Sequence, residues 1–339
     1  MKSGASPTNR FPDNRGIAIV IVLWVVLVLS LLISGFAFTM HVETQVASYA
    51  RKELKAEMLA RSGVEVARME LIVGALSPTN SGIDALNQEW ATNALMYVDH
   101  ELGDGIYNVK VTDEESKIPI NRATDLQLKR LFGLLGADPA DGDVITDSIL
   151  DWIDADDLTR LNGAESDYYQ SLSPPYRAKN APLDRVEELL LIRGVTPELY
   201  KGTPATDTDP ARPGLQDVFT TMTSGFINVN TASAIVLGTL GLDDAQVQAV
   251  LARRDGADGI PGTDDDLPFH SAEEFFAAIG NLDPEAKQSA QPLVAVTSSF
   301  FTVKSTGEVG GVKRTILATL YRNAGKVQTV MWREVREGT

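Results

Sequence analysis

The chain has 339 residues, no cysteine and a formal net charge of −16, from 46 acidic and 30 basic side chains. Without cysteine it can form neither disulfides nor thiolate metal sites. Its acidity argues against nucleic acid as a partner, because a protein that binds a duplex needs a basic surface to displace counterions.

The first feature along the chain is an apolar run of 22 residues from Ile17 to Phe38 that contains no charged side chain. As a helix, such a run would span about 33 Å, enough to cross a bilayer core of about 30 Å. No proline follows between 40 and 76, and small or apolar residues recur three or four apart at Ala56, Ala60, Gly63, Ala67 and Leu71. We therefore predict one helix from 17 to about 76, with its first third in lipid and its remainder packed on a soluble domain.

A cleaved secretory signal is the alternative for this segment. Lys2, Arg10 and Arg15 precede the apolar run, and Gly35-Phe36-Ala37 weakly imitates a cleavage site. However, the run exceeds the about 7–15 apolar residues of a typical signal sequence, and the helical pattern continues beyond it. A retained anchor is the favoured interpretation.

The rest of the chain indicates an α+β protein. The long helix should stop in the Pro- and Gly-containing segment 76–82, and a helical piece is expected at 84–95. Helices and loops alternate from 122 to 292. Strand patterns flank that stretch, at 106–111, 117–120, 300–305, 313–321 and 327–335, with turns at 310–311 and 323–325. The simplest architecture is an antiparallel sheet packed on the long helix and interrupted by a large all-helical insertion.

The polar leader that ends in Gly16, the apolar run that starts at Ile17 and the amphipathic continuation resemble the type IV pilin and pseudopilin family. The resemblance implies that a prepilin peptidase cuts between Gly16 and Ile17 and that the new N-terminus is methylated. Most members carry a glutamate four residues after the first mature residue, where it neutralises a neighbouring subunit's N-terminus. This chain has Ile21 there. Because it lacks that pairing group, we expect it at the tip of a filament.

Five blocks in the predicted insertion resemble, in this order, the protein K family of type II secretion systems, the large minor pseudopilins: 149–157, 163–169, 174–183, 187–196 and 226–232. That family also lacks the glutamate. The resemblance implies a non-enzymatic subunit that works at the tip of a pseudopilus with other minor pseudopilins, beside the major pseudopilin. It would help initiate assembly and so export folded proteins across the outer membrane.

The family resemblance also implies a location and a domain division. The chain would cross the inner membrane once, with its C-terminal domain in the periplasm. The expected parts are a prepilin leader (1–16), a transmembrane segment (17–38), a periplasmic helix with the first strands (39–121), an inserted helical domain of helix-hairpin-helix or SAM-like type (122–292) and the C-terminal strands (293–339).

An acidic cluster lies in the predicted insertion, where nine carboxylates and a single basic residue, Arg160, occur between Asp141 and Asp167. A solvated acidic loop is one interpretation. Calcium is the other, since it takes six to eight oxygen ligands and members of the family are known to bind it in this insertion. The candidate ligands are Asp151, Asp154, Asp156, Asp157, Glu165 and Asp167, although Asp151 could instead cap its helix or stay exposed.

A second acidic loop, Asp255–Asp266, alternates aspartate with glycine, and glycine allows the sharp turns that wrap a cation. The loop departs from the EF-hand pattern, because its third residue is neither acidic nor an amide and its twelfth is not glutamate. Both cation binding and an acidic surface loop remain open for it.

A membrane-anchored protein for DNA binding or uptake is the alternative function. Residues 190–195 and 227–232 resemble pieces of helix-hairpin-helix modules, but the surrounding carboxylates would repel phosphates. Enzymatic activity has little support, because His41, His100 and His270 are isolated and neither a phosphate-binding glycine loop nor a nucleophile elbow occurs. Trp152 and the pair Tyr168-Tyr169 are expected to pack in a core.

Overall fold

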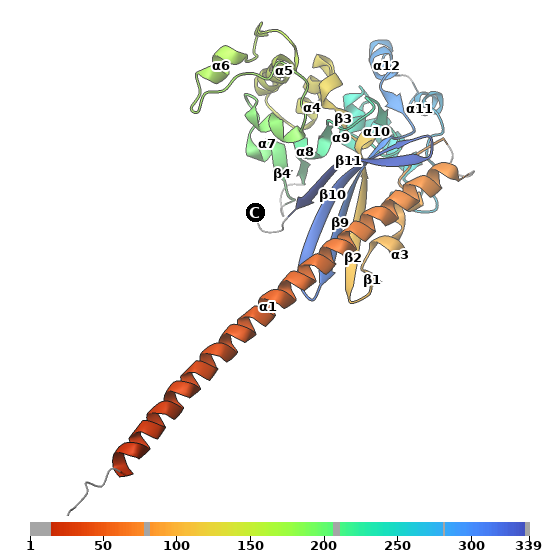
Figure 1. Ribbon diagram of the computed structural model, residues 1–339. Coiled ribbons are helices and arrows are strands. Elements are labelled where there is room, and N and C mark those ends of the chain that lie inside the picture. Colours follow the sequence, from red (N-terminus) through yellow and green to blue (C-terminus); the bar gives the residue numbers. More distant parts are fainter. Residues whose placement is uncertain (1–14, 78–81, 206–210, 281, 336–339) are drawn as a thin grey trace, which may run out of the picture. The chain divides into compact units, whose positions relative to one another are not determined.

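The computed structural model of the protein describes residues 15–77, 82–205, 211–280 and 282–335 (Figure 1). Most of the predicted leader, residues 1–14, lies outside this range, as do residues 78–81 of the segment expected to end the long helix. The chain divides into two compact units, residues 1–55 and 56–339. Helix α1 (Arg15–Leu76) begins in the first unit and continues into the second.

Within the described residues, the first unit is the part of α1 up to Lys55, which includes the apolar run 17–38. The prediction of one helix from 17 to about 76 is confirmed. Its apolar side chains, such as Ile19, Leu23 and Leu32, are more than half exposed. Among the described residues, α1 is the one helix that is long and apolar enough to cross a membrane. The unit therefore fits a single-pass membrane anchor.

The second unit is built on a five-stranded antiparallel sheet with the strand order β1-β2-β9-β10-β11 (Figure 1). The strands are β1 (His100–Leu102), β2 (Gly105–Asp113), β9 (Phe300–Val309), β10 (Val312–Asn323) and β11 (Lys326–Val335). The predicted long strands are confirmed, whereas β1 was not expected. β2 pairs directly with β9, so that Tyr107 lies opposite Gly307. The insertion therefore separates β2 from β9 in the sequence, although the two strands are neighbours in the sheet.

Both predicted hairpin turns are present. Gly310 and Gly311 join β9 to β10 with φ of 53° and 81°, and Ala324 and Gly325 join β10 to β11 with φ of 48° and 77°. Two successive residues with positive φ match the right-handed twist of the flanking strands, which is why glycine is favoured there.

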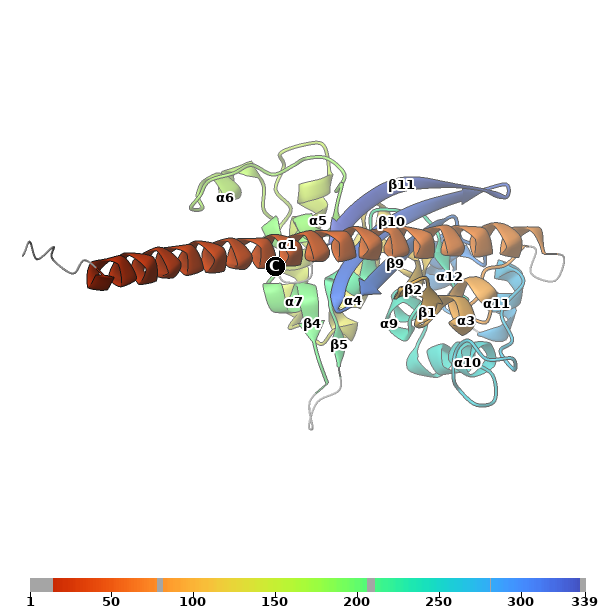
Figure 2. The ribbon, with the colours of Figure 1, turned by 60° about the horizontal axis from the view of Figure 1, so that its bottom comes forward.

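One face of the sheet packs against α1 from residue 56 onward (Figure 2). The predicted stripe of small and apolar residues is the contact surface, and Ala60, Ala67 and Leu71 are fully buried. They pack with alternate side chains of the central strands, including Phe301 and Val303. Small side chains let the helix axis approach the sheet closely.

The closest approach of helix and sheet is at two glycines. A Cβ on Gly63 would lie 2.7 Å from Val109 Cγ2 and would also meet Ser305 Oγ. On the other side of the contact, a Cβ on Gly307 would lie 2.7 Å from the backbone nitrogen of Ala60. Contacts this short are absent from real packing, so both positions require glycine.

We therefore expect Gly63→Ala to lower the free energy of unfolding by about 1–3 kcal/mol through overpacking, although alanine normally stabilises a helix by about 1 kcal/mol relative to glycine. Gly74→Ala on the same helix is the matched control, because a Cβ there meets nothing within 4 Å, and it should raise the stability or leave it unchanged. Urea denaturation of the full chain in detergent micelles measures both. Equal stability changes for the two variants would contradict the close approach.

Two local predictions are wrong. The helical piece expected at 84–95 begins only at Glu89, as α2 (Glu89–Thr92) and α3 (Ala94–Tyr97), because the Asp84 backbone N–H donates to the Val296 carbonyl at 2.8 Å. The strand expected at 117–120 is reduced to β3 (Ile118–Pro119), which pairs in parallel with β6 (Phe219–Thr220) and not with the main sheet. Proline removes a ladder donor, so this segment could not extend the sheet.

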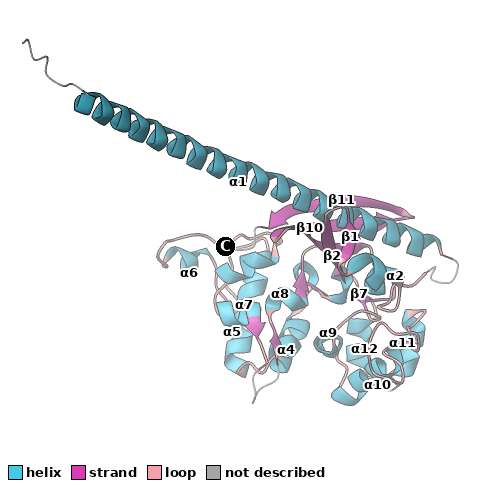
Figure 3. Cartoon of the chain, turned by 90° about the horizontal axis from the view of Figure 1, so that it is seen from below, coloured by secondary structure: helices cyan, strands magenta, loops and turns pink. Residues whose placement is uncertain are grey.

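Between β2 and β9 the chain forms the helical insertion (Figure 3). Its α-helices are α4 (Asp125–Leu134), α5 (Pro139–Ile153), α6 (Ser166–Gln170), α7 (Pro197–Lys201), α8 (Leu215–Val218), α9 (Ala234–Thr239), α10 (Asp244–Arg254), α11 (Ala272–Ala278) and α12 (Pro284–Ala290). The 3-10 turns in the described part of the insertion are η1 (Glu114–Ser116), η2 (Ile120–Arg122) and η3 (Val186–Leu191).

The insertion is helical apart from paired strands of two residues each. These are β3 with β6, β4 (Gly202–Thr203) with β5 (Arg212–Pro213), and β7 (Ile227–Asn228) with β8 (Val294–Ala295). The insertion has its own hydrophobic core, separate from the core between α1 and the sheet. Trp152 and Tyr169 are buried in it with ring centroids 5.1 Å apart, so the predicted core role of these aromatic residues is confirmed.

A buried polar network joins the insertion to the sheet. The carboxylate of Asp113, at the end of β2, accepts hydrogen bonds from Asn228 Nδ2 at 3.1 Å and from Ser298 Oγ at 2.6 Å. Asn228 also donates to the Asp84 carbonyl at 3.0 Å, and Asp84 forms an ion pair with Arg322 of β10. Five residues that are far apart in the sequence are therefore held together by hydrogen bonds and an ion pair where the insertion leaves and re-enters the sheet.

Candidate metal centre

The acidic cluster lies on α5, on the following loop 154–165 and at the start of α6, at the periphery of the insertion (Figure 1). Asp138 caps α5 by accepting from the Ala140 N–H at 2.9 Å, and Pro139 occupies its first turn. The helix ends at Ile153, so the carboxylates that follow it project from a loop and not from a helix face.

The structure brings three carboxylates together. One oxygen each from Asp154, Asp156 and Glu165 lies within 4.8 Å of the others. Glu165 is only 2% exposed, and neither of its oxygens has a hydrogen-bond donor within the described part of the chain. The same holds for the buried Oδ1 of Asp154. Burial, followed by the charges of Asp151, Asp154 and Asp157, raises the pKa of Glu165 to about 7.

Asn180, which sequence reasoning missed as a site residue, places its side chain against the acidic loop. Its Nδ2 donates to the Asp156 carbonyl at 2.7 Å, while its Oδ1 has no donor among the described residues. Asn180 adopts φ of +47°, a conformation that asparagine tolerates better than most residues. It follows the cis Ser173–Pro174 segment and reaches the cluster only through the tertiary fold, so spacing in the sequence could not reveal it.

The other three predicted ligands fall outside this group. Asp151 is fully buried rather than exposed or capping, and its carboxylate accepts from the Arg160 N–H at 3.2 Å and pairs with Arg160 Nε at 3.3 Å. Asp157 accepts from the Ser166 N–H at 3.4 Å, and hydrogen bonds from Ser166 and Asn180 lower its pKa. Asp167 is exposed on α6.

The donor set has the chemistry that calcium prefers. Three carboxylates and an amide oxygen are hard ligands, and several of these oxygens are buried without a compensating hydrogen bond. Orphaned buried carboxylate oxygens are costly unless a cation compensates them. The group therefore fits a calcium ion, with water completing a coordination number of six to eight.

The second acidic loop, residues 255–266, satisfies its own carboxylates. Asp265 Oδ2 accepts from the Ala257 N–H at 2.6 Å, and Asp266 Oδ2 accepts from the Gly262 N–H at 2.8 Å. Hydrogen bonds, first from the Thr263 hydroxyl and then from the Ala257 N–H, lower the pKa of Asp265. This arrangement favours an acidic surface loop closed by its own backbone.

Several of the residues that suggested DNA binding are part of the interior of the insertion. Asn228 and Asn230 are fully buried, and Asn230 exchanges two hydrogen bonds with the Phe269 backbone at 2.8 and 2.9 Å. At the other hairpin, Gly194 has φ of +86° and packs against Ile145 of α5. Both segments therefore contribute contacts to the interior of the insertion.

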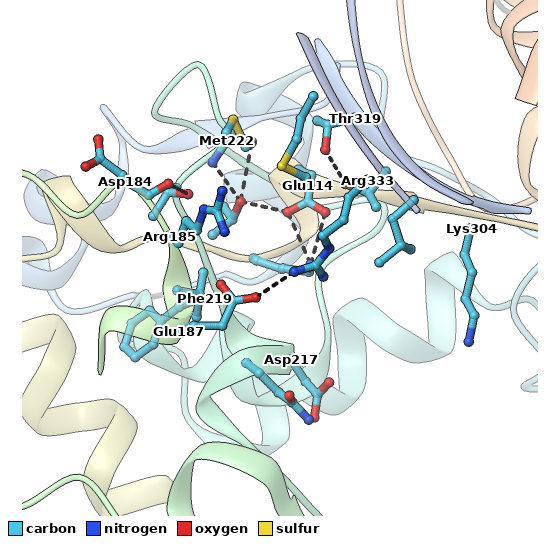
Figure 4. Close-up of a pocket in the computed structure, with 18 of the residues that line it drawn as sticks. Glu114, Asp184, Arg185, Glu187, Asp217, Phe219, Met222, Lys304, Thr319 and Arg333 are labelled. Atoms are coloured by element: carbon cyan, nitrogen blue, oxygen red, sulfur yellow. Dashed lines mark hydrogen bonds and ion pairs between the residues drawn. The ribbon is translucent and has the colours of Figure 1, made fainter. Parts of the chain in front are cut away.

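A cleft of about 620 Å³ separates the second face of the sheet from the insertion (Figure 4). Its charged side chains are largely paired: Lys117 lies 3.1 Å from Glu114, and Arg333 lies 3.3 Å from Glu187 across the cleft. The second pair links β11 to η3, and the paired charges indicate a structural seam more than a ligand site.

The long apolar helix, the antiparallel sheet and the helical insertion together define a pseudopilin fold with an inserted domain. The same fold occurs in the crystal structure of the GspK-GspI-GspJ complex from enterotoxigenic Escherichia coli, with a TM-score of 0.68 and 20% identity. That match covers 86% of this chain and 99% of the matched chain.

Sequence profiles named for type II secretion system protein K match residues 105–203 and 227–297, together half of the chain. The chain therefore belongs to the type II secretion system protein K family. Similar proteins of that name occur in Pectobacterium carotovorum (29% identity over 58% of this chain and 55% of the relative), Klebsiella pneumoniae (28%, 56% and 60%) and Pseudomonas aeruginosa (25%, 96% and 94%). The first two matches span little more than half of each relative's length.

Proposed function

We propose that the protein is a minor pseudopilin at the tip of the type II secretion pseudopilus, where it helps initiate assembly and thereby the export of folded proteins across the outer membrane. The insertion is the observation that carries this proposal, because it places a separate helical core on a pseudopilin sheet. A subunit enlarged in this way fits poorly between stacked neighbours. Ile21, which offers no carboxylate to a subunit above, supports the same position.

The membrane arrangement follows from the first unit. Ile17 would become the N-terminus after a prepilin peptidase removes residues 1–16 and would then be methylated, and the apolar part of α1 would hold the chain in the inner membrane. The second unit would lie in the periplasm. Its proposed partners are the other minor pseudopilins of the tip and the major pseudopilin below, and its role is mechanical rather than catalytic.

A calcium ion bound by Asp154, Asp156 and Glu165, with Asn180 as an amide ligand, is part of the proposal. The ion would neutralise carboxylates that now lie close together and would tie the loop 154–165 to the start of α6. The orphaned oxygens of Glu165 support this assignment most directly. For a tip subunit, such a tie would stiffen the periphery of the insertion.

The proposal is tested by isolating the protein from membranes of cells that also express the two other minor pseudopilins of the same secretion system. After detergent extraction it should co-purify with both as one species, and N-terminal sequencing should begin at Ile17. Gly16→Val, which disturbs only the cleavage position, is the control and should leave Met1 as the N-terminus. An intact Met1 in the wild type, an N-terminus near Phe38, or failure to co-purify would contradict the assignment.

A further inference from the structure

The loop 154–165 displays two leucines in water. Leu158 is 78% exposed and Leu161 is 97% exposed, and they lie on the same connection as the candidate calcium ligands. Single exposed apolar residues are ordinary in proteins. Two leucines on one short peripheral loop form a small apolar projection that the insertion core does not use.

The loop is held in shape by hydrogen bonds, so the exposure of the leucines does not come from an unsupported chain. The Leu158 N–H donates to Asp156 Oδ1 at 2.9 Å, and the Arg160 N–H donates to Asp151 at 3.2 Å. The Asn162 N–H donates to Asp147 Oδ2 at 3.0 Å. The first bond closes a local turn, and the other two anchor the backbone of Arg160 and Asn162 to α5, while Leu158 and Leu161 stay exposed. An apolar element ordered before binding loses less entropy when a partner covers it.

The metal site and the leucines are mechanically linked. Asp154 and Asp156 precede Leu158 by a few residues, and Glu165 closes the loop after Leu161. Asp156 both belongs to the carboxylate group and accepts from the Leu158 N–H. Without a cation, the three carboxylates repel one another and favour a looser loop. Bound calcium would therefore favour the conformation in which the leucines project.

The charge around the leucines selects the kind of partner. Asp154, Asp156, Asp157 and Asp167 lie within six residues of one of the leucines along the chain, and the intervening Arg160 already pairs with Asp151 and Asp154. An anionic lipid surface would be repelled, and so would a second copy of a chain with a net charge of −16. A protein surface with an apolar pocket and a basic rim would be attracted.

We propose that Leu158 and Leu161 form a calcium-dependent docking element that inserts into an apolar pocket with a basic rim on a neighbouring minor pseudopilin. This inference rests on the proposed function, both the calcium site and the tip complex. It adds a contact surface and gives the metal a purpose, since calcium would regulate assembly by fixing the loop.

The test measures binding of the full chain, in detergent micelles, to the purified pair of other minor pseudopilins from the same system. Leu158→Ser/Leu161→Ser should weaken binding about tenfold or more in calcium, and chelation with EGTA should weaken binding of the wild type by a similar factor. Ile260→Ser/Leu267→Ser is the matched control. Ile260 is 58% exposed on the other acidic loop and Leu267, directly after that loop, is 61% exposed, and the control should bind like the wild type.

Each outcome bears on the proposal. Unchanged binding by the Leu158/Leu161 variant overturns it, while normal calcium binding by calorimetry and normal wild-type complex formation would leave the proposed function intact. A wild type that does not bind the pair overturns both proposals together.

Because the chain has no cysteine, Leu161→Cys can carry a single environment-sensitive dye. A dye response in nanodiscs of phosphatidylethanolamine and phosphatidylglycerol without the pair would assign the leucines to lipid, and leucine-dependent dimerisation of the chain alone would assign them to a second copy.

Discussion

Replacing Arg322 with methionine is expected to lower the free energy of unfolding by about 3–5 kcal/mol, because the change leaves the Asp84 carboxylate charged and buried without its partner. The side chains of Arg322 and Asp84 are only 10% and 3% exposed. Arg322 Nη2 also donates to the Ser298 carbonyl at 2.8 Å, and its guanidinium lies 4.8 Å from the Phe301 ring centroid. The substitution therefore removes an ion pair, a hydrogen bond and a packing contact at once.

The location of Arg322 makes the effect global. Arg322 ties the last long hairpin of the sheet to the point where the chain returns from the insertion, and Asp84 joins the same polar network through Asn228. Without the guanidinium, the charge of Asp84 would act on nearby Asp113, which is already fully buried. We expect the insertion and the sheet to loosen together.

Urea denaturation of the full chain in detergent micelles, followed by tryptophan fluorescence, measures this loss. Arg333→Met is the matched control, because Arg333 pairs with Glu187 while both side chains are about half exposed, at 47% and 50%. Exposed pairs contribute about 0–1 kcal/mol. The double variant Asp84→Asn/Arg322→Met should recover part of the lost stability, since it removes the unpaired charge. If Arg322→Met and Arg333→Met lowered the free energy of unfolding equally, the buried pair of Arg322 and Asp84 would not be a major contribution to stability.

Calcium removal is the second large expected effect. At a free calcium concentration about a hundred times Kd, bound calcium would add about 2.7 kcal/mol to the stability, and chelation should lower Tm by about 4–5 °C. Differential scanning fluorimetry of the full chain in calcium and in EGTA measures the shift. No change of Tm on chelation, together with no heat in calorimetric titration, would remove calcium from the proposed function.

The stability of the metal-free chain should fall with rising pH, whereas its stabilisation by calcium should grow. In EGTA, the pKa of Glu165 is raised to about 7 from its ordinary 4.5, so the folded chain holds a proton that the unfolded chain releases. The associated stability is complete below about pH 4.5 and is lost as pH rises through 7, so the metal-free chain should be less stable at pH 8 than at pH 6. In calcium, protons compete with the ion, and the stabilisation by calcium should increase over the same interval.

Glu165→Gln separates the metal effect from other titrations. Burial, and next the charge of Glu115, also raise the pKa of Asp113 to about 7, so part of the pH dependence should persist in every variant. Glu165→Gln should be at least as stable as the wild type in EGTA at pH 8 and less stable in saturating calcium. Asp167→Asn is the control, because Asp167 is exposed outside the carboxylate group, and it should follow the wild type in both conditions.

Much of the fold could be predicted because its determinants are local. The apolar run from Ile17, the small residues that face the sheet and the alternating pattern of the final strands each specify an element through spacing alone. The glycine pair at 310–311 predicted its turn, because both positions have a positive φ that glycine adopts readily. By contrast, Asp84 and the segment 117–120 were misassigned, because their conformations follow from the partners Val296, Arg322 and β6.

The acidic cluster shows the same division at the site. Sequence spacing located the loop and six candidate ligands, and the structure brings together the oxygens of three of them, Asp154, Asp156 and Glu165. The spacing could not show that Asp151 forms an ion pair with Arg160 or that Asp167 is exposed. Nor could it show that Asn180, which follows a proline-rich segment, contacts the loop. Whether a carboxylate is free to bind a cation depends on which donors surround it in space.

The sequence by itself determined that this protein has a membrane-length apolar helix, a split antiparallel sheet and a helical insertion rich in acid, because periodicity and charge are written along the chain. Only the tertiary structure decided that Gly63 and Gly307 let helix and sheet meet, that Arg322 and Asp84 bind the insertion to the sheet, and that Leu158 and Leu161 stand outside the core. The physical reason is that burial and pairing are properties of neighbours in space, which residues far apart in the sequence supply to one another.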